Sequence, residues 1–342
     1  MTGSPTADPI GIRAYHPGDE TALLACYNQV FPTADGRIPP RTLAHWQWKF
    51  RDNPAGRIQI TLGAHAADGS VVSTYAGIPV RIQAEGVCNL ASQSADLVVL
   101  PRWRRHGGRP GLFAQTGRLW MDLFLGEERG QNLFTFGWPI PAWRAGQRYL
   151  GYLNIRDWDI RVREPGPGFL PRQGPGELEV VQVARFGADV DALWQRLVPE
   201  LKLALIRDQR YLNWRYADHP DVRYALFECR ERGSRALRGV CVYRVSDWLR
   251  PNTGYIVDWL VPAADADATV ALLAQCERRV SADGAHVLGT LFNHVDPRFL
   301  AFQRLGFMVL GTPYFLVVAT TRLDTVYYRD NFYLTLGDSD LL

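Results

Sequence analysis

The sequence predicts a protein of two tandem domains, each with a mixed α/β fold. The chain has 342 residues, which exceeds the size at which a single hydrophobic core usually stops growing. An internal repeat divides this length into two similar halves, and each half runs through helix and strand signals in the order of a mixed sheet. We therefore expect one sheet with covering helices in each half.

An aromatic motif marks the repeat most clearly. Residues 48–54 read WKFRDNP and residues 214–220 read WRYADHP, 166 positions later. Two further pairs follow in the same order: Val99-Leu-Pro101 with Leu260-Val-Pro262, and Leu150-Gly-Tyr152 with Leu305-Gly-Phe307. Three ordered matches favour duplication of a unit of roughly 150 residues, a normal domain length. Unrelated aromatic-rich loops are the alternative.

A segment rich in proline and glycine separates the two copies. Residues 164–176 read EPGPGFLPRQGPG, a composition that breaks both helices and strands. We therefore predict an N-terminal domain at 1–163, a linker at 164–176 and a C-terminal domain at 177–342.

The first half begins with an amphipathic helix, in which apolar residues recur every three or four positions. Strand signals follow, and two of them flank the turn Ala67-Asp-Gly-Ser70. The expected elements are a helix at 20–31, strands at 58–66, 71–82 and 94–100, a helix at 111–125 and a strand at 132–137.

The second half repeats this order with a longer helix in its middle. The expected elements are a helix at 188–198, a helical stretch at 207–216, strands at 223–229, 237–245 and 254–261, a helix at 266–282, a strand at 286–292, a helix at 297–305 and a last strand pair within 307–320. Antiparallel strands followed by alternating helices and strands constitute a mixed sheet.

The segment from Asp96 to Gly111 carries the clearest chemical signal. A strand ends at Pro101, a turn rich in arginine and glycine follows, and a helix begins directly after Gly111. Glycines let the backbone approach a ligand closely, and the amides at a helix start attract anions. Because the arginines add positive charge, the sequence predicts a turn that binds a pyrophosphate. An arginine-rich surface turn is the alternative.

At this segment the sequence resembles the GNAT (GCN5-related N-acetyltransferase) family. Pro101-Arg-Trp-Arg-Arg-His-Gly107 is similar to the family's acetyl-CoA signature, in which Arg/Gln-x-x-Gly-x-Gly/Ala follows a strand. Arg104 and Gly107 match the signature, whereas Arg109 stands where its last glycine is expected. The resemblance implies acetyl-CoA or another acyl-CoA as co-substrate. The implied binding residues are Val98, Val99, Leu100, Arg104, Arg105, His106, Gly107, Gly108, Arg109 and Gly111.

The resemblance extends over both halves, from about residue 12 to residue 318. It includes tandem GNAT proteins encoded near bacterial polysaccharide genes, which have an ending similar to Gly337-Asp-Ser-Asp340. Of the 38 basic residues only Lys49 and Lys202 are lysines, an excess of arginine that is typical of high-GC bacterial genomes.

The second copy differs at the position of the turn. Pro262 is followed by AADADA, which contains no glycine and places Asp265 and Asp267 at the start of the helix. Carboxylates there occupy the positive end of the helix dipole and repel phosphate. We therefore expect CoA to bind the first copy and not the second.

The resemblance also implies a mechanism, in which the acceptor amine attacks the thioester directly while strand amides polarise its carbonyl. Asp96 is the candidate base, with a structural carboxylate as the alternative. The usual tyrosine acid is replaced by Phe302 in the second copy and by Gln147 in the first. Tyr149 is the nearest phenol, and a packed aromatic side chain is the alternative.

Three functions follow from these features. The first is an acyl-CoA-dependent acyltransferase, an N-acetyltransferase in the simplest case, acting on an amine or amino sugar. The second is an aminoacyl-tRNA-dependent transferase of the Fem type, which the net charge of +3 disfavours because no basic groove for RNA is implied. The third is a non-catalytic module that binds CoA or serves assembly.

Composition restricts the remaining classes. Hydrophobic residues make up 47% and charged residues 21%, as in ordinary globular proteins. The five cysteines are scattered, no metal-ligand spacing occurs, and no run of 18 apolar residues is present. We expect a cytoplasmic protein with no metal, no nucleic acid and no membrane span, a small-molecule or saccharide acceptor, and a homodimer as an open alternative.

Overall fold

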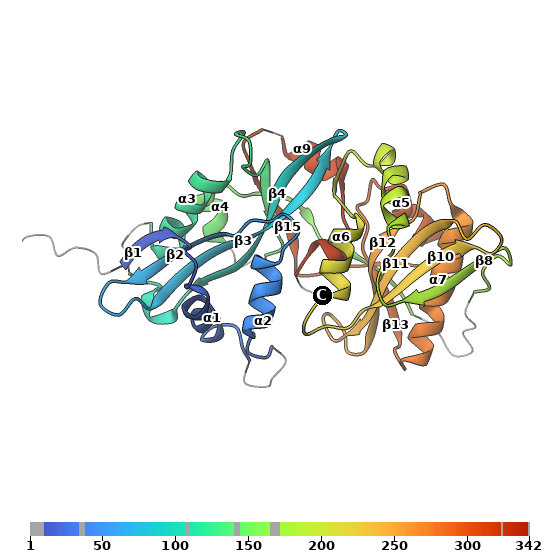
Figure 1. Cartoon of the computed structure of the whole chain (residues 1–342), viewed down its shortest axis with the longest axis horizontal. Coiled ribbons are helices and arrows are strands. Elements are labelled where there is room, and N and C mark those ends of the chain that lie inside the picture. The colour runs from blue at the N-terminus through green and yellow to red at the C-terminus, as the bar shows by residue number, and fades with distance from the viewer. Residues whose placement is uncertain are drawn as a thin grey trace, which may run out of the picture. The chain divides into compact units, whose positions relative to one another are not determined.

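The computed structural model describes residues 10–33, 38–106, 108, 110–139, 144–164, 172–322 and 324–340. The chain forms two compact units. Unit 1 comprises Met1–Val80, Leu90–Asn154 and Val317–Leu323, and unit 2 comprises Arg81–Asn89, Ile155–Leu316 and Asp324–Leu342. Each unit is built on a mixed sheet with helices (Figure 1), so the predicted fold class is confirmed.

Unit 1 contains a sheet whose central strands pair in parallel. Its strands, in spatial order, are β1 (Ile10–Ala14), β2 (Gln59–His65), β3 (Val71–Ala84), β4 (Val87–Val99), β5 (Phe134–Gly137) and β15 (Phe315–Thr320). The pair β4 and β5 is parallel, and β15 is antiparallel to β5. The far ends of β3 and β4 belong to unit 2, and β6 (Leu153–Asp157) crosses the boundary between the units.

The helices of unit 1 are α1 (Glu20–Asn28), α2 (Leu43–Trp46), a π-helical turn η1 (Gln47–Arg51), a 3₁₀ turn η2 (Pro101–Trp103), α3 (Leu112–Phe124) and α4 (Arg144–Leu150). Helix α3 forms because its apolar residues recur at helical spacing, and it buries Leu112, Thr116 and Trp120 on one face. The Trp120 indole donates a hydrogen bond to the Gln59 carbonyl of β2 (2.9 Å). This contact fixes the helix on the sheet.

Unit 2 contains a seven-stranded sheet. Its strands, in spatial order, are β14 (Met308–Leu310), β7 (Ile160–Arg163), β13 (Val287–Thr290), β12 (Thr253–Leu260), β11 (Leu237–Ser246), β10 (Ala225–Glu231) and β8 (Leu178–Val183). Only β12 and β13 pair in parallel among these described neighbours. A small addition comes from β9 (Leu203–Leu205), which pairs with the end of β3 and with β16 (Phe332–Tyr333).

The helical elements of unit 2 are α5 (Asp189–Leu197), η3 (Val198–Glu200), α6 (Gln209–Leu212), the π-helical turn η4 (Asn213–Ala217), α7 (Ala266–Ala282), α8 (Pro297–Arg304), α9 (Thr325–Asn331) and η5 (Leu336–Asp338). Helix α7 packs across strands β10–β13 (Figure 1). It has the bounds predicted from the sequence.

The repeated aromatic motif forms the same irregular helix in each unit. In unit 1, α2 continues into the π turn η1, and in unit 2, α6 continues into the π turn η4. The caps also correspond, because Thr42 accepts a hydrogen bond from the amide of His45 and Asp208 accepts one from the amide of Tyr211. Since π turns are rare, two at a constant offset of 166 residues support a duplication.

One strand from each half lies in the sheet of the other half. Strand β7 pairs with β13 and places Val162 opposite Gly289, and β15 pairs with β5 and places Val317 opposite Gly137. The compact units therefore do not follow the chain order of the predicted domains at 1–163 and 177–342, and the bounds of the duplicated segment stay a prediction.

The predicted strand pair within residues 307–320 is wrong. Strand β14 pairs with β7 and β15 pairs with β5, so the two do not pair with each other. The connection between them instead follows the residues before β7, where the Trp158 amide donates to the Tyr314 carbonyl (3.0 Å) and the Thr312 hydroxyl donates to the Trp158 carbonyl (2.5 Å).

Candidate active site in unit 1

Strand β4 leaves its parallel partner halfway along its length. Among the described residues, Ser92 pairs with Thr135 and Gln93 with Phe136, where the register of β4 and β5 ends. Asp96 then takes a positive φ of 50°, a conformation that interrupts regular strand pairing. The Thr74 hydroxyl on β3 donates to the Asp96 carbonyl (2.7 Å) and holds the irregular backbone.

The Asp96 carboxylate lies between two cations from the irregular helix region. It forms ion pairs with Arg41 and with Lys49 (3.1 Å), and all three side chains are at least nine-tenths buried. Burial raises the pKa of Asp96, but the charges of Arg41 and Lys49 outweigh it and lower the pKa to about 2. At neutral pH this carboxylate is ionised and a weak base.

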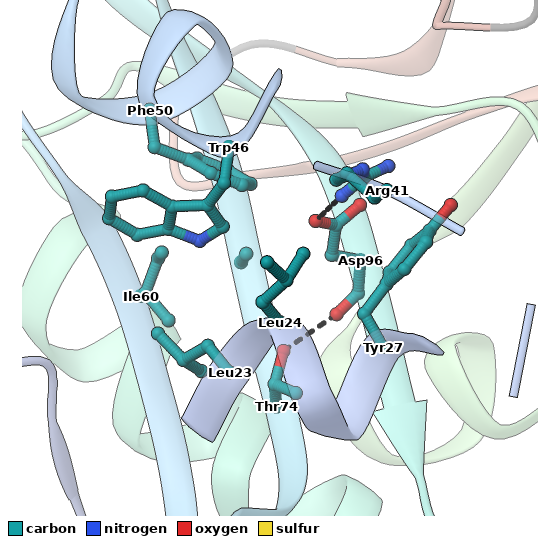
Figure 2. Close-up of a pocket in the computed structure, with 10 residues that line it drawn as sticks. Leu23, Leu24, Tyr27, Arg41, Trp46, Phe50, Ile60, Thr74 and Asp96 are labelled. Atoms are coloured by element: carbon teal, nitrogen blue, oxygen red, sulfur yellow. Dashed lines mark hydrogen bonds and ion pairs between the residues drawn. The ribbon is translucent and has the colours of Figure 1, made fainter. Parts of the chain in front are cut away.

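A small cavity opens beside this ion pair. Figure 2 shows Arg41 facing the Asp96 carboxylate, with Tyr27, Trp46 and Thr74 around them. The cavity measures ≈ 10 Å³, which is room for roughly one water molecule. It is therefore too small for an acyl chain. The ion pairs of Asp96 tie β4 to the helix region, and its role as a base stays a prediction.

The predicted phosphate-binding turn lies at the end of β4 and leads into α3. The turn η2 begins at Pro101, and the Arg104 Nε donates to the Val99 carbonyl (3.3 Å). Gly111 occupies the N-cap of α3, which has no side-chain cap. A Cβ at Gly111 would lie 3.6–3.9 Å from the carbonyls of Arg104, His106 and Gly108, so the turn folds closely around the helix start.

The other predicted binding residues divide by exposure. Arg104, Arg105 and Gly108 are exposed, His106 is half-buried against Trp103, and Gly108 has a φ of 64°. On the strand, Val98 and Leu100 are buried and Val99 is half-buried, and the Leu100 amide donates to the Val72 carbonyl of β3. Gly107 and Arg109 lie outside the described residues.

Tyr149 lies on α4, where it is half-buried and has the Arg148 guanidinium 5.5 Å from its ring centre. Gln147, at the position of the expected tyrosine acid, is exposed. The contact with Arg148 brings no acid or base to the phenol, and the catalytic role of Tyr149 stays a prediction.

A cluster of four hydroxyl groups, which sequence reasoning missed, lies where β4 and β5 part. The Tyr152 hydroxyl hydrogen-bonds to those of Tyr75 (2.7 Å), Ser94 and Thr135 (3.3 Å), and Ser94 bonds to Thr135 (3.0 Å). Burial raises the pKa of both tyrosines, so they are protonated at neutral pH. Ser94 is half-buried and is the member of this hydroxyl cluster with access to the surface.

The sequence contained a signal for this cluster. Tyr152 belongs to the repeated motif in which the second copy has Phe307, and Thr135 corresponds to Val287 when the paired glycines Gly137 and Gly289 are aligned. A hydroxyl confined to one copy of a duplicated core position indicates a special environment in that copy.

In unit 2 a buried ion pair corresponds to that of Arg41 and Asp96. Arg207, 166 positions after Arg41, bonds to Asp258 on β12 (2.9 Å) and also to Asp338 (2.7 Å) near the end of the chain. The Thr335 and Tyr333 hydroxyls of this final segment contact Asp258 and the Trp259 carbonyl. This final segment, which contains Tyr333, Thr335 and Asp338, therefore covers part of β12. That part of β12 corresponds to the part of β4 in unit 1 that no longer pairs with β5.

In unit 2, the start of the corresponding helix, α7, is occupied by a side chain of the same unit. The Asp265 side chain caps α7 by accepting from the amide of Ala268 (3.0 Å), and it pairs with Arg238 (2.8 Å). An anion would meet a fixed carboxylate at this position. Unit 1 has Gly111 there.

The comparisons with solved structures concern the fold. GCN5-related N-acetyltransferases are among the structures that this chain resembles, and it has their fold. No protein-family model matches the sequence, and no curated protein is similar to it in sequence.

Three solved structures illustrate the likeness. A conserved Enterococcus faecalis V583 protein described as a probable N-acyltransferase has a TM-score of 0.63 at 13% identity, over 94% of this chain and 74% of its own. A GCN5-related N-acetyltransferase from Anabaena variabilis has a TM-score of 0.62 at 11% identity, over 94% and 75%. Saccharomyces cerevisiae N-myristoyltransferase with bound myristoyl-CoA has a TM-score of 0.57 at 11% identity, over 94% and 81%. At these identities the likeness concerns the fold.

Among the described residues, no helix is long and apolar enough to cross a membrane. The same residues contain no group of three or more histidine, cysteine, aspartate or glutamate side chains that could hold a metal ion.

Proposed function

We propose that unit 1 binds an acyl-CoA at residues 98–111 and that the protein transfers the acyl group to an amine or amino-sugar acceptor. The observation that carries this proposal is the difference between the two helix starts. Gly111 leaves the start of α3 without a side-chain cap, next to the exposed Arg104 and Arg105, whereas Asp265 caps the start of α7. A pyrophosphate fits the first environment and is repelled by the second.

The proposed reaction needs no covalent intermediate on the protein. The neutral amine attacks the thioester carbonyl carbon, the carbon–sulfur bond breaks, its electron pair goes to sulfur, and the proton lost by the amine ends on the CoA thiol. The backbone of β4 beyond Gln93, where pairing with β5 ends, supplies amides toward the developing oxyanion.

The residue roles follow from burial and charge. With a pKa of about 2, Asp96 is a poor general base, and we assign it a positioning role in which Arg41 and Lys49 hold the irregular strand. We assign to Ser94, the half-buried member of the hydroxyl cluster, the role of donating a hydrogen bond toward sulfur. Water removes the amine proton in this scheme.

A non-catalytic module that binds CoA is the second candidate. It is favoured by the low pKa of Asp96 and by the burial of the Tyr75 and Tyr152 phenols. This candidate shares the binding site and differs only in turnover.

Titration calorimetry of the full chain with acetyl-CoA and myristoyl-CoA tests the proposal. We expect saturable binding of at least one, and an affinity about tenfold lower in Arg104→Ala because one charged contact to phosphate is lost. Arg278→Ala, which removes an exposed arginine of unit 2, is the matched control. Absence of binding by both thioesters refutes the proposal. Binding without thiol release in the presence of a panel of amines and amino sugars selects the second candidate.

A further inference from the structure

Arg161 has a buried guanidinium that lacks a hydrogen-bond acceptor. It lies on β7, between β13 and β14, and is 1% exposed. No described residue accepts a hydrogen bond from its Nε, Nη1 or Nη2 atoms. The guanidinium carbon lies 3.4 Å from the centre of the Phe299 ring on α8. Stacking of this kind recovers only part of the cost of burying an ion.

The fold itself does not require an arginine at this position. Strand β15 is the counterpart of β7 at the 155-residue offset of the repeat, and Leu316 stands where β7 has Arg161. Leu316 is fully buried. An apolar side chain therefore satisfies the same strand position in the other copy, and a buried charge at Arg161 needs another explanation.

Further donors surround the same phenylalanine. The Arg156 guanidinium bonds to the Asn293 Oδ1 and the His294 Nδ1, and the His294 ring packs edge-on against Phe299 with its centre 4.8 Å away. Asn293 is itself fixed, because its Nδ2 donates to the carbonyls of Arg329 and Phe332. The donors are thus held by side chains anchored in unit 2.

Burial and neighbouring charges shift the pKa values in this cluster. Burial and the charge of Arg156 together lower the pKa of Arg161 to about 10, although Asp159 opposes the shift. Burial and the same two arginines lower the pKa of His294, so the imidazole is neutral near pH 7. Its Nδ1 accepts from Arg156, which leaves the proton on Nε2, 3.9 Å from Asp159. Burial also lowers the pKa of Arg156, and Asp159, Asp330 and Asp157 oppose that shift, whereas Asp159 is the carboxylate that acts on Arg161.

We propose that Arg161, Arg156 and His294 form an oxyanion-binding site in unit 2, which takes a carboxylate or phosphate group of a ligand. Arginine forks match the paired oxygens of both groups, and a bound oxyanion supplies the hydrogen-bond acceptors that Arg161 lacks. The site is independent of the acyl-CoA site proposed in unit 1.

Thermal unfolding of the full chain in Tris chloride, without any CoA, tests this site. Inorganic phosphate and acetate are titrated separately against sodium chloride of equal ionic strength, which distinguishes the two oxyanion classes. We expect a saturable rise of the Tm with at least one of them. In Arg161→Leu we expect an equal or higher Tm in chloride alone and an oxyanion affinity weakened at least about tenfold, because a charged contact is lost.

Arg304→Leu, which removes an exposed arginine of α8, serves as the control for net charge and should respond as the unmodified chain does. Arg161→Lys should retain a weakened response. The site is refuted if neither phosphate nor acetate raises the Tm of the unmodified chain, or if Arg161→Leu responds as strongly as Arg304→Leu. A large fall in the Tm of Arg161→Leu in chloride alone also overturns it, because Arg161 would then serve the fold.

Discussion

The two units share an irregular helix and a buried ion pair beside their central strands, and they differ at the start of the helix that follows. Both have an α-helix that continues into a π turn, and both tie this region to the central strand through a buried arginine–aspartate pair, Arg41 with Asp96 and Arg207 with Asp258. Only unit 1 has a glycine at the start of the following helix, at Gly111. Shared features of a duplicated fold indicate what the fold needs, and differences indicate what each copy does.

The comparison changes the interpretation of Asp96. From the sequence it is a candidate base, since it lies on the strand that leads to the phosphate-binding turn. Unit 2 keeps an equivalent pair although Asp265 caps the start of its helix, so we expect the pair to be independent of acyl-CoA binding. This comparison favours a structural role for both pairs.

The largest predicted effect tests this structural role. In Arg207→Ala, Asp258 and Asp338 remain buried without their cation, and we expect a loss of about 3–5 kcal/mol in the free energy of unfolding. In Arg41→Ala the loss should be smaller, about 2 kcal/mol, because Lys49 still pairs with Asp96. Urea denaturation of both variants measures the difference. Equal stability of Arg207→Ala and the unmodified chain would contradict a structural role for the pair.

The second prediction exchanges the helix starts. Gly111 has an extended conformation that an aspartate adopts without strain, and its Cβ would meet neighbours at 3.6 Å or more. In Gly111→Asp the new carboxylate should cap α3 as Asp265 caps α7, which leaves stability unchanged within a few tenths of a kcal/mol. The affinity for acyl-CoA should fall about 100-fold, because a fixed carboxylate replaces the environment of the phosphate. Calorimetry measures both chains.

Two control variants separate the effect of a new charge at the helix start from the effect of a new side chain there. Gly111→Asn caps the helix without a charge and should weaken binding less, about tenfold. Asp265→Ala should cost about 1 kcal/mol of stability and leave acyl-CoA affinity unchanged, because the proposed acyl-CoA site lies in unit 1. Unchanged affinity in Gly111→Asp would show that the ligand does not lie at this helix.

Local patterns predicted the fold class and many of the elements, but they missed several short ones, and long-range pairing did not follow from them. The missed elements include β1, α4, β6, β7, β8 and α9. The spacing of apolar residues gave α7 its bounds, and the repeat located the two irregular helices. The exchange of β7 and β15 was not predictable, because a strand of four to six residues carries no information about which sheet it joins.

The candidate site was predictable only where its residues are adjacent in the sequence. The turn from Pro101 to Gly111 forms one continuous segment, so its composition revealed it. The partners of Asp96 lie 55 and 47 positions away in the chain, and two of the partners of Tyr152, Tyr75 and Ser94, lie 77 and 58 positions away. Such contacts depend on how β3, β4 and α4 pack together. The spacing of apolar residues along the sequence does not specify this packing.

The smallest predicted effect concerns the hydroxyl cluster, where Tyr152 and Phe307 occupy equivalent positions. Tyr152→Phe removes the hydroxyl that joins Tyr75 to Ser94, and we expect a loss of about 1–2 kcal/mol in the free energy of unfolding. If Ser94 assists the departing sulfur, thiol release should fall about tenfold while acyl-CoA affinity stays constant, because Ser94 loses its bond to Tyr152. The reciprocal variant Phe307→Tyr inserts a hydroxyl into the buried core of unit 2 and should lower stability without changing thiol release. Equal turnover in both variants would assign the cluster to the fold alone, and a change in turnover confined to Tyr152→Phe would join it to the chemistry of unit 1.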